Sequence, residues 1–361
     1  MNQERYSIII GSGSYIPTRK VTNEDFINNT FYAQDGSRLQ KTNEEIISQF
    51  EHITGIKERR YVTDDLVTSD IAFFAARDAV EASQIDPETL DYIIVAHNFG
   101  DIRADNPRSE FVPSLASRVK HGLGINNPQT IAYDLPFGCA GWLQGVIQGN
   151  YYIKSGCASK ILVIGAETLS RISDPHDRDS MIYADGAGAV VIAATESKQP
   201  VGILANCVQS YANELAYVLQ MGKSSNPCYN SDRLFLKMQG RKLYEHALKI
   251  VPAAIKECIT KAGLTITDIN KLLIHQANNK MDEAILKQLF SLYNIKQVPN
   301  NVMPMTISWL GNSSVATLPT LYDLFSKDRI EHYTLEKGST IVFAAVGAGV
   351  NINAIVYKIP A

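Results

Sequence analysis

The sequence of 361 residues is poor in cysteine and lacks any long hydrophobic run. Its five cysteines are an odd number, which leaves no complete set of disulfides, and they form no CxxC pair or other metal-ligand spacing. No segment reaches the roughly 18 uninterrupted apolar residues that a membrane span needs, and the polar N-terminus lacks a secretory pattern. We therefore expect reduced thiols in a cytoplasmic protein, with no bound metal and no membrane partner.

The sequence also lacks an excess of positive or negative charge. Lys and Arg number 34 and Asp and Glu number 37, which gives a formal net charge of −3. A protein of this charge has no general attraction for nucleic acid or for an anionic membrane, so neither is expected as a partner. With 45% hydrophobic residues, the chain can bury a large core in one big or two medium domains.

Apolar, β-branched stretches alternate with helical ones, which predicts an α/β fold, and this pattern runs twice. Residues 79–96 and 259–276 share a helix, a polar turn and a buried strand. Two glycine-containing motifs of the first half also return in the same order in the second: Gly138-Cys139 as Gly311-Asn312, and Gly186-Ala187-Gly188 as Gly347-Ala348-Gly349. We therefore predict two duplicated halves, residues 1–200 and 201–361, whose equivalent elements meet at one centre.

Cys139 is the first candidate catalytic residue. It lies between a predicted short strand, residues 131–134, and a predicted helix over residues 140–153. The unpaired N–H groups of a helix start carry a partial positive charge, which favours thiolate, so we expect a lowered pKa for this cysteine. Glycines recur every four residues in the helix, which predicts close contact with another helix, and the other four cysteines are interpreted as ordinary thiols.

His275 and Asn312 are the predicted partners of Cys139. His275 ends an apolar strand, where open α/β sheets place their chemistry, and His97 is the alternative at the corresponding point of the first half. Asn312 lies between glycine and serine, a context typical of a turn residue or a helix cap. Its position corresponds to that of Cys139 in the first half, which favours a catalytic role. Cysteine, histidine and asparagine together suit acyl transfer, and the local signature of papain-like proteases is absent.

These residues resemble the β-ketoacyl-acyl carrier protein synthase III family of the thiolase superfamily. Besides the Cys139 turn, the resemblance rests on motifs spread over nearly the whole chain: residues 11–26, 54–60, 167–170, 185–189, 275–278 and 311–312. It implies a thiolase-like, five-layered αβαβα fold, a homodimer, no cofactor, and a ping-pong reaction. An acyl group would load on Cys139 and then condense with a malonyl-type thioester that loses CO₂.

The resemblance also implies roles for individual residues. His275 and Asn312 would donate hydrogen bonds to the malonyl thioester carbonyl, so that decarboxylation leaves an enolate. The backbone N–H groups of Cys139 and Ala348 would form the oxyanion hole. Degradative thiolases carry a second cysteine where this chain has Val346, which favours the decarboxylating reaction.

Substrate delivery is implied less directly. Arg178 matches an arginine that lies on the adenine side of coenzyme A in the family, and Lys280 matches a position at which the carrier protein docks. Either residue could equally be a solvated charge on the surface. Asn278 belongs to the His275 motif. Gln49 stands where members primed by coenzyme A carry tryptophan, and residues 29–42 look like an insertion. We therefore expect acyl carrier protein or coenzyme A thioesters as partners and favour a carrier-bound primer or a specialised acyl group over acetyl-coenzyme A.

Two alternatives to a fatty-acid ketosynthase stay open. One is a specialised condensing enzyme of secondary metabolism, such as a dialkylresorcinol-forming ketosynthase. The other is a non-catalytic subunit of a ketosynthase heterodimer, which would be expected to lack the cysteine that this chain keeps.

Overall fold

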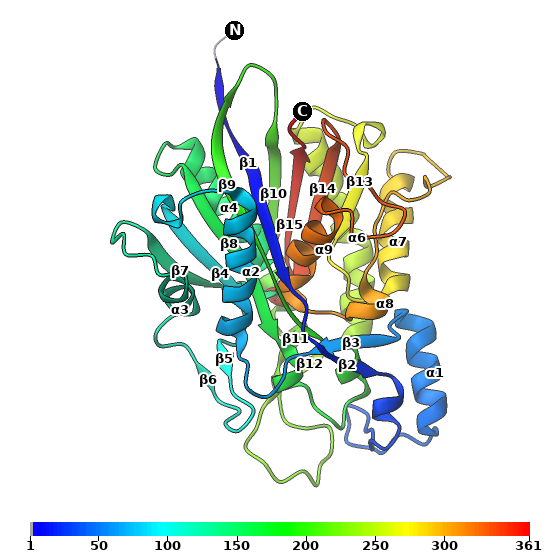
Figure 1. Cartoon of the computed structure of the whole chain (residues 1–361). Coiled ribbons are helices and arrows are strands. Elements are labelled where there is room, and N and C mark those ends of the chain that lie inside the picture. Colours follow the sequence, from blue (N-terminus) through cyan, green and yellow to red (C-terminus); the bar gives the residue numbers. More distant parts are fainter. Residues whose placement is uncertain (1–2) are drawn as a thin grey trace.

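Two β-sheets divide the helices of the molecule into three layers (Figure 1), and the computed structural model describes residues 3–361. The first sheet has five strands, in the spatial order β1 (Glu4–Tyr15), β9 (Asp185–Ser197), β8 (Lys160–Thr168), β4 (Tyr92–His97) and β7 (Ile131–Pro136). The second sheet has four, in the order β10 (Gly202–Ser210), β15 (Asn351–Lys358), β14 (Thr340–Gly347) and β13 (Lys271–Ile274).

The two sheets share strand order and sense. In the first, β1 and β8 are antiparallel to β9, and β4 is parallel to β8. In the second, β10 and β14 are antiparallel to β15, and β13 is parallel to β14. Of the repeated glycine motifs, Gly186-Ala187-Gly188 lies in β9, whereas its counterpart Gly347-Ala348-Gly349 spans the end of β14 and the turn that leads into β15. The strands of the two sheets lie on either side of the predicted boundary near residue 200, which itself stays a prediction.

Helices α4 (Gly141–Lys154) and α9 (Thr317–Ser326) lie between the sheets and share one core with strands of both. Helices α2 (Thr68–Ser83) and α3 (Leu115–Gly122) pack on the outer face of the first sheet, and α6 (Gly240–Lys261) and α7 (Asn279–Ser291) on that of the second. The order helix, sheet, helix, sheet, helix confirms the predicted thiolase-like, five-layered fold.

The sandwiching explains the strand sequences. A strand covered by helices on both faces must be apolar at consecutive positions rather than at alternate ones. In β8, all but the first residue are buried, and β14 is buried throughout. Burial of each large apolar side chain contributes about 1.5–3 kcal/mol, so the two sheets and the central helices form a core that holds the strand ends in fixed positions.

The glycines of α4 correct one expectation. The helix itself begins and ends within one residue of the prediction. However, a Cβ on Gly145 would lie 2.8 Å from Cγ1 of Val163, and one on Gly149 would lie 2.6 Å from Cδ1 of Ile192. Both neighbours belong to strands of the first sheet, so the prediction of close helix-to-helix contact was wrong at these positions. The glycines instead let α4 lie directly on a sheet.

Short elements connect these layers. The remaining strands and α-helices are β2 (Arg19–Thr22), β3 (Glu58–Tyr61), β5 (Asp101–Ile102), β6 (Ser109–Glu110), β11 (Leu219–Gly222), β12 (Phe235–Met238), α1 (Asn43–Thr54), α5 (Ala212–Leu215) and α8 (Ile307–Leu310). The 3₁₀ turns are η1 (Glu24–Phe26), η2 (Pro87–Thr89), η3 (Gly138–Ala140), η4 (Leu169–Ile172), η5 (Arg178–Ile182), η6 (Ala216–Val218), η7 (Ile266–Asp268), η8 (Ser314–Ala316) and η9 (Ala348–Val350).

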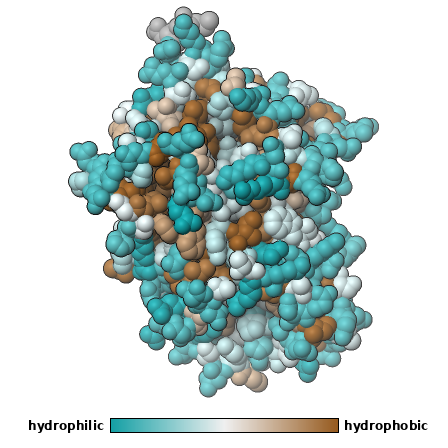
Figure 2. All heavy atoms as spheres, in the orientation of Figure 1, coloured by the Kyte–Doolittle hydropathy of each residue, from teal (hydrophilic) through white to brown (hydrophobic). Residues whose placement is uncertain are grey.

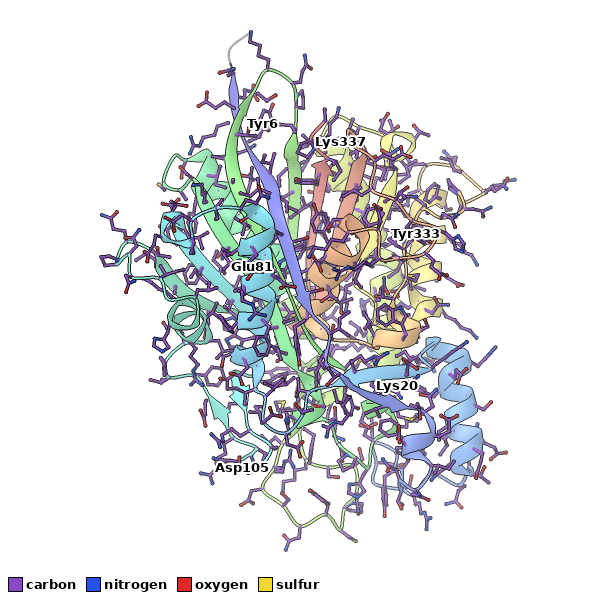
Figure 3. The ribbon with its side chains drawn as sticks, viewed as in Figure 1. Tyr6, Lys20, Glu81, Asp105, Tyr333 and Lys337 are labelled. Carbon is purple, nitrogen blue, oxygen red and sulfur yellow. The ribbon has the colours of Figure 1, made fainter. Side chains whose placement is uncertain are left out.

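The surface is largely polar. Lys20, Glu81, Asp105 and Lys337, labelled in Figure 3, are exposed. Hydrophobic residues gather mainly on the left half of the face drawn in Figure 2, over the first sheet. Among the helices that the structure describes, none combines the length and apolar character needed to cross a membrane.

Candidate active site

The three predicted catalytic residues line one cavity. It has a volume of about 610 Å³, and Cys139, His275 and Asn312 all contribute to its wall, together with Val346 and Gly347. Much of the rest of the wall is apolar and comes from α1, η4, η5, β11, β12, α6 and α7: Ile46, Phe50, Ile53, Leu169, Ile182, Leu219, Leu236, Met238, Leu243 and Met281. Elements of both predicted halves thus enclose a cavity that suits a long, mostly apolar thioester.

Two turns face each other around Cys139. Cys139 lies in η3, between β7 and α4, and Ala348 lies in the turn after β14. Gly138 has φ of +69°, and a Cβ there would lie 2.6 Å from the nitrogen of Ala348. A Cβ on Gly347 would lie 2.4 Å from the nitrogen of Cys139. Only glycine allows the two backbones to approach this closely, so the N–H groups of Cys139 and Ala348 belong to directly adjoining turns.

The thiol of Cys139 has a raised pKa. Burial raises the pKa to about 11 and the negative charge of Glu167 adds to the shift, while a hydrogen bond from Ser314 opposes it. The expectation of a lowered pKa was therefore wrong. Desolvation is the largest cause of the shift, and it outweighs the hydrogen bonds that favour the thiolate.

His275 follows β13 and is 4% exposed. Its backbone N–H donates to the carbonyl of Ala344 at 2.8 Å, which extends the sheet by one residue and fixes the position of the imidazole. Burial lowers the pKa of His275 to about 4, so the ring is neutral near pH 7. Its Nδ1 atom is buried and has no hydrogen-bond partner among residues 3–361.

Gln276, next to His275, is a structural residue. Its Nε2 donates to the carbonyl of Pro304 at 2.9 Å, and its Oε1 accepts the backbone N–H groups of Thr306 at 2.8 Å and of Ile307 at 3.0 Å. These bonds anchor the segment that leads to Asn312. Part of the polar run after His275 therefore holds the site in place rather than lining it.

Asn312 is fixed by its backbone and its side chain. Its N–H donates to Ile182 at 3.0 Å and its carbonyl accepts from Ala184 at 2.8 Å. Its Oδ1 accepts the N–H of Ser314 at 2.8 Å, an orientation that leaves the side-chain NH₂ group as the available donor. The preceding Gly311 has φ of +68°, as the sharp turn requires.

His97, the alternative histidine, has other partners. Its Nε2 lies 3.1 Å from Oδ2 of Asp134, and its Nδ1 accepts the N–H of Gly100 at 3.1 Å. It is 1% exposed and does not line the cavity. His275 is therefore the histidine that shares the cavity with Cys139.

Sequence reasoning missed three polar residues near the sulfur. Oγ of Ser314 donates to Sγ of Cys139 at 3.2 Å. Nδ2 of Asn98 donates to the same Oγ at 3.2 Å and to Oε2 of Glu167 at 2.5 Å. Asn98 directly follows β4 and Glu167 lies near the end of β8, so the strand-end rule that found His275 could have found these two as well.

The predicted binding residues divide into two groups. Arg178 and Asn278 line the cavity, whereas Lys280 is exposed and lies outside its wall. Asn278 also accepts the N–H of Met281 at 3.1 Å and so caps α7. Gln49 lines the cavity and accepts a hydrogen bond from Lys41 at 2.8 Å.

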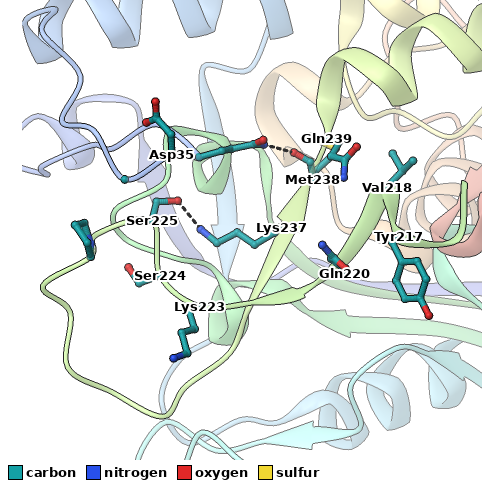
Figure 4. A pocket seen from close by; sticks show the side chains of 13 residues that line it. Asp35, Tyr217, Val218, Gln220, Lys223, Ser224, Ser225, Lys237, Met238 and Gln239 are labelled. Carbon is teal, nitrogen blue, oxygen red and sulfur yellow. Dashed lines mark hydrogen bonds between the residues drawn. The ribbon is translucent and has the colours of Figure 1, made fainter.

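A second cavity, of about 390 Å³, lies beside the predicted insertion (Figure 4). Gln34 of that segment donates to the carbonyl of Met238 at 2.9 Å, and Met238 lines both cavities. Lys237 in this cavity is engaged by Asp174 at 2.5 Å and Asp177 at 3.0 Å, so its charge is already balanced. Within residues 3–361, no three His, Cys, Asp or Glu side chains form a metal-binding cluster.

The fold and the cavity together place the molecule among thiolase-like proteins, and comparisons narrow the class. Family models of 3-oxoacyl-[acyl-carrier-protein (ACP)] synthase III match residues 133–211, and those of its C-terminal domain match residues 259–359. The chain belongs to this family of ketosynthases.

Solved structures agree over the whole length. The synthase III of Thermus thermophilus is 29% identical, with a TM-score of 0.79, over 97% of this chain and 98% of the other. That of Aquifex aeolicus is 28% identical, with a TM-score of 0.77, over 98% and 99%. The priming β-ketosynthase of the R1128 polyketide pathway is 25% identical, with a TM-score of 0.80, over 100% and 98%.

Proposed function

We propose that the protein is a decarboxylating ketosynthase that uses Cys139 as its nucleophile. The observation that carries this proposal is the meeting of a cysteine, a neutral histidine and an asparagine in one apolar cavity. Apolar walls strengthen hydrogen bonds to a developing negative charge and accommodate a thioester. Membership of the ketosynthase family adds independent support.

In the loading step, Sγ of Cys139 attacks the carbonyl carbon of an acyl thioester. The Sγ–C bond forms, the bond from that carbon to the donor sulfur breaks, and the proton of Cys139 ends on the released donor thiol. The N–H groups of Cys139 and Ala348 would hold the oxyanion of the tetrahedral intermediate. The close approach of their two turns supports this assignment.

In the condensation step, His275 and Asn312 donate to the carbonyl oxygen of a malonyl-type thioester. A neutral imidazole and a carboxamide stabilise the negative charge that builds up as CO₂ leaves. The resulting carbanion attacks the acyl carbon on Cys139, a carbon–carbon bond forms, and Sγ departs with the electron pair of the broken C–S bond. The product is a β-ketoacyl thioester.

We propose an acyl carrier protein as the preferred donor, with coenzyme A thioesters as the second possibility. Arg178 and Asn278 would contact the donor from the cavity wall, and exposed Lys280 would meet an acidic carrier outside it. Gln49, which accepts from Lys41 rather than offering an aromatic platform, favours a carrier over coenzyme A.

A specialised condensing enzyme, such as a dialkylresorcinol-forming ketosynthase, is the second candidate function. Residues 29–42 favour it, because Gln34 ties this segment to Met238 of the cavity wall and can thereby shape primer choice. Resemblance to a priming ketosynthase of a polyketide pathway points the same way. A non-catalytic subunit is disfavoured because Cys139 opens on the cavity.

We also propose a homodimer in the cytoplasm. Strand β7 is an edge of the first sheet, and its first residue, Ile131, is 49% exposed. Phe111 and Val112 are 48% and 89% exposed, large values for apolar side chains. A second copy would cover this edge.

Five cysteines without a disulfide suit a reducing compartment. Light scattering and cell fractionation test the two statements.

Turnover tests the proposed function. The purified protein is incubated with malonyl carrier protein and a panel of acyl primers on carrier protein or coenzyme A, and products are identified by mass spectrometry. We expect a β-ketoacyl product that Cys139→Ala abolishes. Formation of product by Cys139→Ala, or no product from any primer together with no acyl-enzyme, would overturn the proposal.

A further inference from the structure

The environment of the Cys139 sulfur contains a hydrogen-bond donor that the proposed mechanism does not use. Oγ of Ser314, in η8, donates to Sγ of Cys139, in η3, at 3.2 Å. Ser314 also lines the catalytic cavity. A group in contact with the nucleophilic atom can act on it directly, so Ser314 differs from residues that only support the fold.

The surrounding bonds fix the direction of the Ser314 hydroxyl. Nδ2 of Asn98 donates to Oγ of Ser314 at 3.2 Å, and an amide nitrogen cannot accept in return. The hydroxyl proton therefore points away from Asn98, toward Sγ. Asn98 is itself held by Glu167, whose Oε2 accepts both the backbone N–H and Nδ2 of Asn98, at 3.0 and 2.5 Å.

The backbone of Ser314 adopts a strained conformation at this point. Its φ of +53° lies in the left-handed region, which is unfavourable for a residue other than glycine. Its N–H donates to Oδ1 of Asn312 at 2.8 Å. One residue in an uncommon conformation thus contacts two of the proposed catalytic residues, a placement in which strain commonly serves function.

We propose that Ser314 is a catalytic residue that stabilises the Cys139 thiolate through its hydroxyl proton, with Asn98 and Glu167 as positioning residues. The inference rests on the proposed function of Cys139 as nucleophile. It gives Ser314 a role in both half-reactions. The hydroxyl holds negative charge on Sγ before attack on the primer, and again when Sγ leaves during carbon–carbon bond formation. No proton is transferred from Ser314 in either step.

The need for such a donor follows from the burial of the sulfur. A thiol with a pKa of about 11 is ionised in roughly one molecule in ten thousand at pH 7. Hydrogen bonds to a charged group are stronger than those between neutral groups, so a hydroxyl aimed at the sulfur favours the anion. Glu167 acts in the opposite direction, because its negative charge disfavours a second anion nearby.

The test is the pH dependence of iodoacetamide alkylation at Cys139, which requires no turnover. A Cys157→Ser/Cys228→Ser parent removes the two exposed thiols, and peptide mass spectrometry follows Cys139. Ser314→Ala should alkylate roughly tenfold more slowly at pH 8, since the loss of a charge-assisted hydrogen bond raises the thiol pKa by about one unit. Asn98→Ala should slow alkylation less, whereas Glu167→Gln should accelerate it by removing a charge.

Ser313→Ala is the matched control, because Ser313 is an adjacent buried serine whose hydroxyl lies 3.4 Å from that of Thr317 and has no bond to the sulfur. It should stay within twofold of the parent. Ser314→Gly removes the hydroxyl while relieving the positive φ, so it should slow alkylation and raise the melting temperature. This second variant keeps the test decisive if Ser314→Ala folds poorly.

The possible outcomes separate the two proposals. An alkylation profile of Ser314→Ala that overlays the parent, or an equal effect of Ser313→Ala, would overturn the role of Ser314. If the shift occurs but no acyl thioester ever loads on Cys139 of the parent, the serine role stands and the proposed ketosynthase function fails.

Discussion

The backbone of Gly347 packs against the backbone of Cys139 so closely that a Cβ on Gly347 would lie 2.4 Å from the Cys139 nitrogen. This contact joins the turn after β14, in the second sheet, to the turn before α4, which carries the nucleophile. It sets the two proposed oxyanion donors beside each other. The proposed chemistry therefore depends on a glycine that takes no part in it through a side chain.

Gly347→Ala should disrupt both stability and catalysis. The added methyl group has no space, so the two turns must separate, at a cost of about 1–3 kcal/mol. We expect a lower melting temperature and a large loss of acyl loading, measured by thermal denaturation and by intact-mass spectrometry. Gly240→Ala is the control, since a Cβ there meets only Cε of Met238 at 3.6 Å. Comparable loading by Gly347→Ala and the parent would contradict the assigned geometry.

The reactivity of Cys139 should keep rising with pH. The thiolate is the nucleophile, and burial places the pKa of Cys139 at about 11, above the ordinary value of about 8.5 for a free cysteine. Alkylation of the unliganded protein should therefore increase roughly tenfold per pH unit from pH 6 to pH 9 without a plateau. A thiol with the ordinary pKa of about 8.5 should begin to level off within this range. A plateau for Cys139 at or below pH 8 would show that the helix start, rather than burial, dominates.

His275→Ala should separate the two half-reactions. The imidazole is proposed to act only on the malonyl carbonyl, so acyl loading should stay within a few-fold of the parent. Condensation should fall by a factor of roughly 10²–10³, the usual cost of losing one oxyanion donor. Intact mass measures loading, and release of CO₂ from malonyl carrier protein measures the second step. An equal loss in both steps would refute the division of roles.

Asn312→Asp should also impair condensation while sparing acyl loading, but for a different reason. The aspartate oxygen can still accept the Ser314 N–H, as Oδ1 of Asn312 does at 2.8 Å. However, the variant replaces the NH₂ donor with a negative charge that repels an enolate. We expect normal folding, measured by circular dichroism, with decarboxylation reduced at least as far as in His275→Ala. Retained decarboxylation would mean that Asn312 serves only as a turn residue.

Carrier docking can be tested on α7. Lys280→Glu reverses an exposed charge next to the His275 motif, and Lys287→Glu makes the same change further along the helix. The first should raise KM for an acyl carrier protein several-fold, and more at low salt, while the second should not. Neither should change KM for a short acyl thioester of N-acetylcysteamine. Equal effects of the two variants would exclude a specific docking role for Lys280.

Much of the fold was predictable because local patterns decide it. Alternating apolar, β-branched and helical stretches indicated an α/β fold, and the repetition of this pattern along the chain agrees with two sheets of the same strand order. Cys139, His275 and Asn312 were found because strand ends and helix starts are marked in the sequence by glycine and polar residues. Their meeting in one cavity follows from the pairing of the two halves.

Other properties of the site depend on contacts between distant segments. The raised pKa of Cys139 comes from burial and from the charge of Glu167, and Ser314 opposes it, although both residues lie far from Cys139 in the sequence. Asn98 donates both to Glu167 in β8 and to Ser314 in η8, and no local pattern predicts hydrogen bonds between segments so far apart in the sequence. Likewise, the spacing of the glycines in α4 predicted contact with another helix, although the nearest side chains belong to strands of the first sheet.

Intact-mass spectrometry of the protein after incubation with acyl thioesters tests the central claim most directly. The parent should gain the mass of one acyl group, the modified peptide should contain Cys139, and Cys139→Ala should gain nothing. An acyl group carried by Cys139→Ala, or located on another cysteine of the parent, would contradict the assignment of Cys139 as the nucleophile.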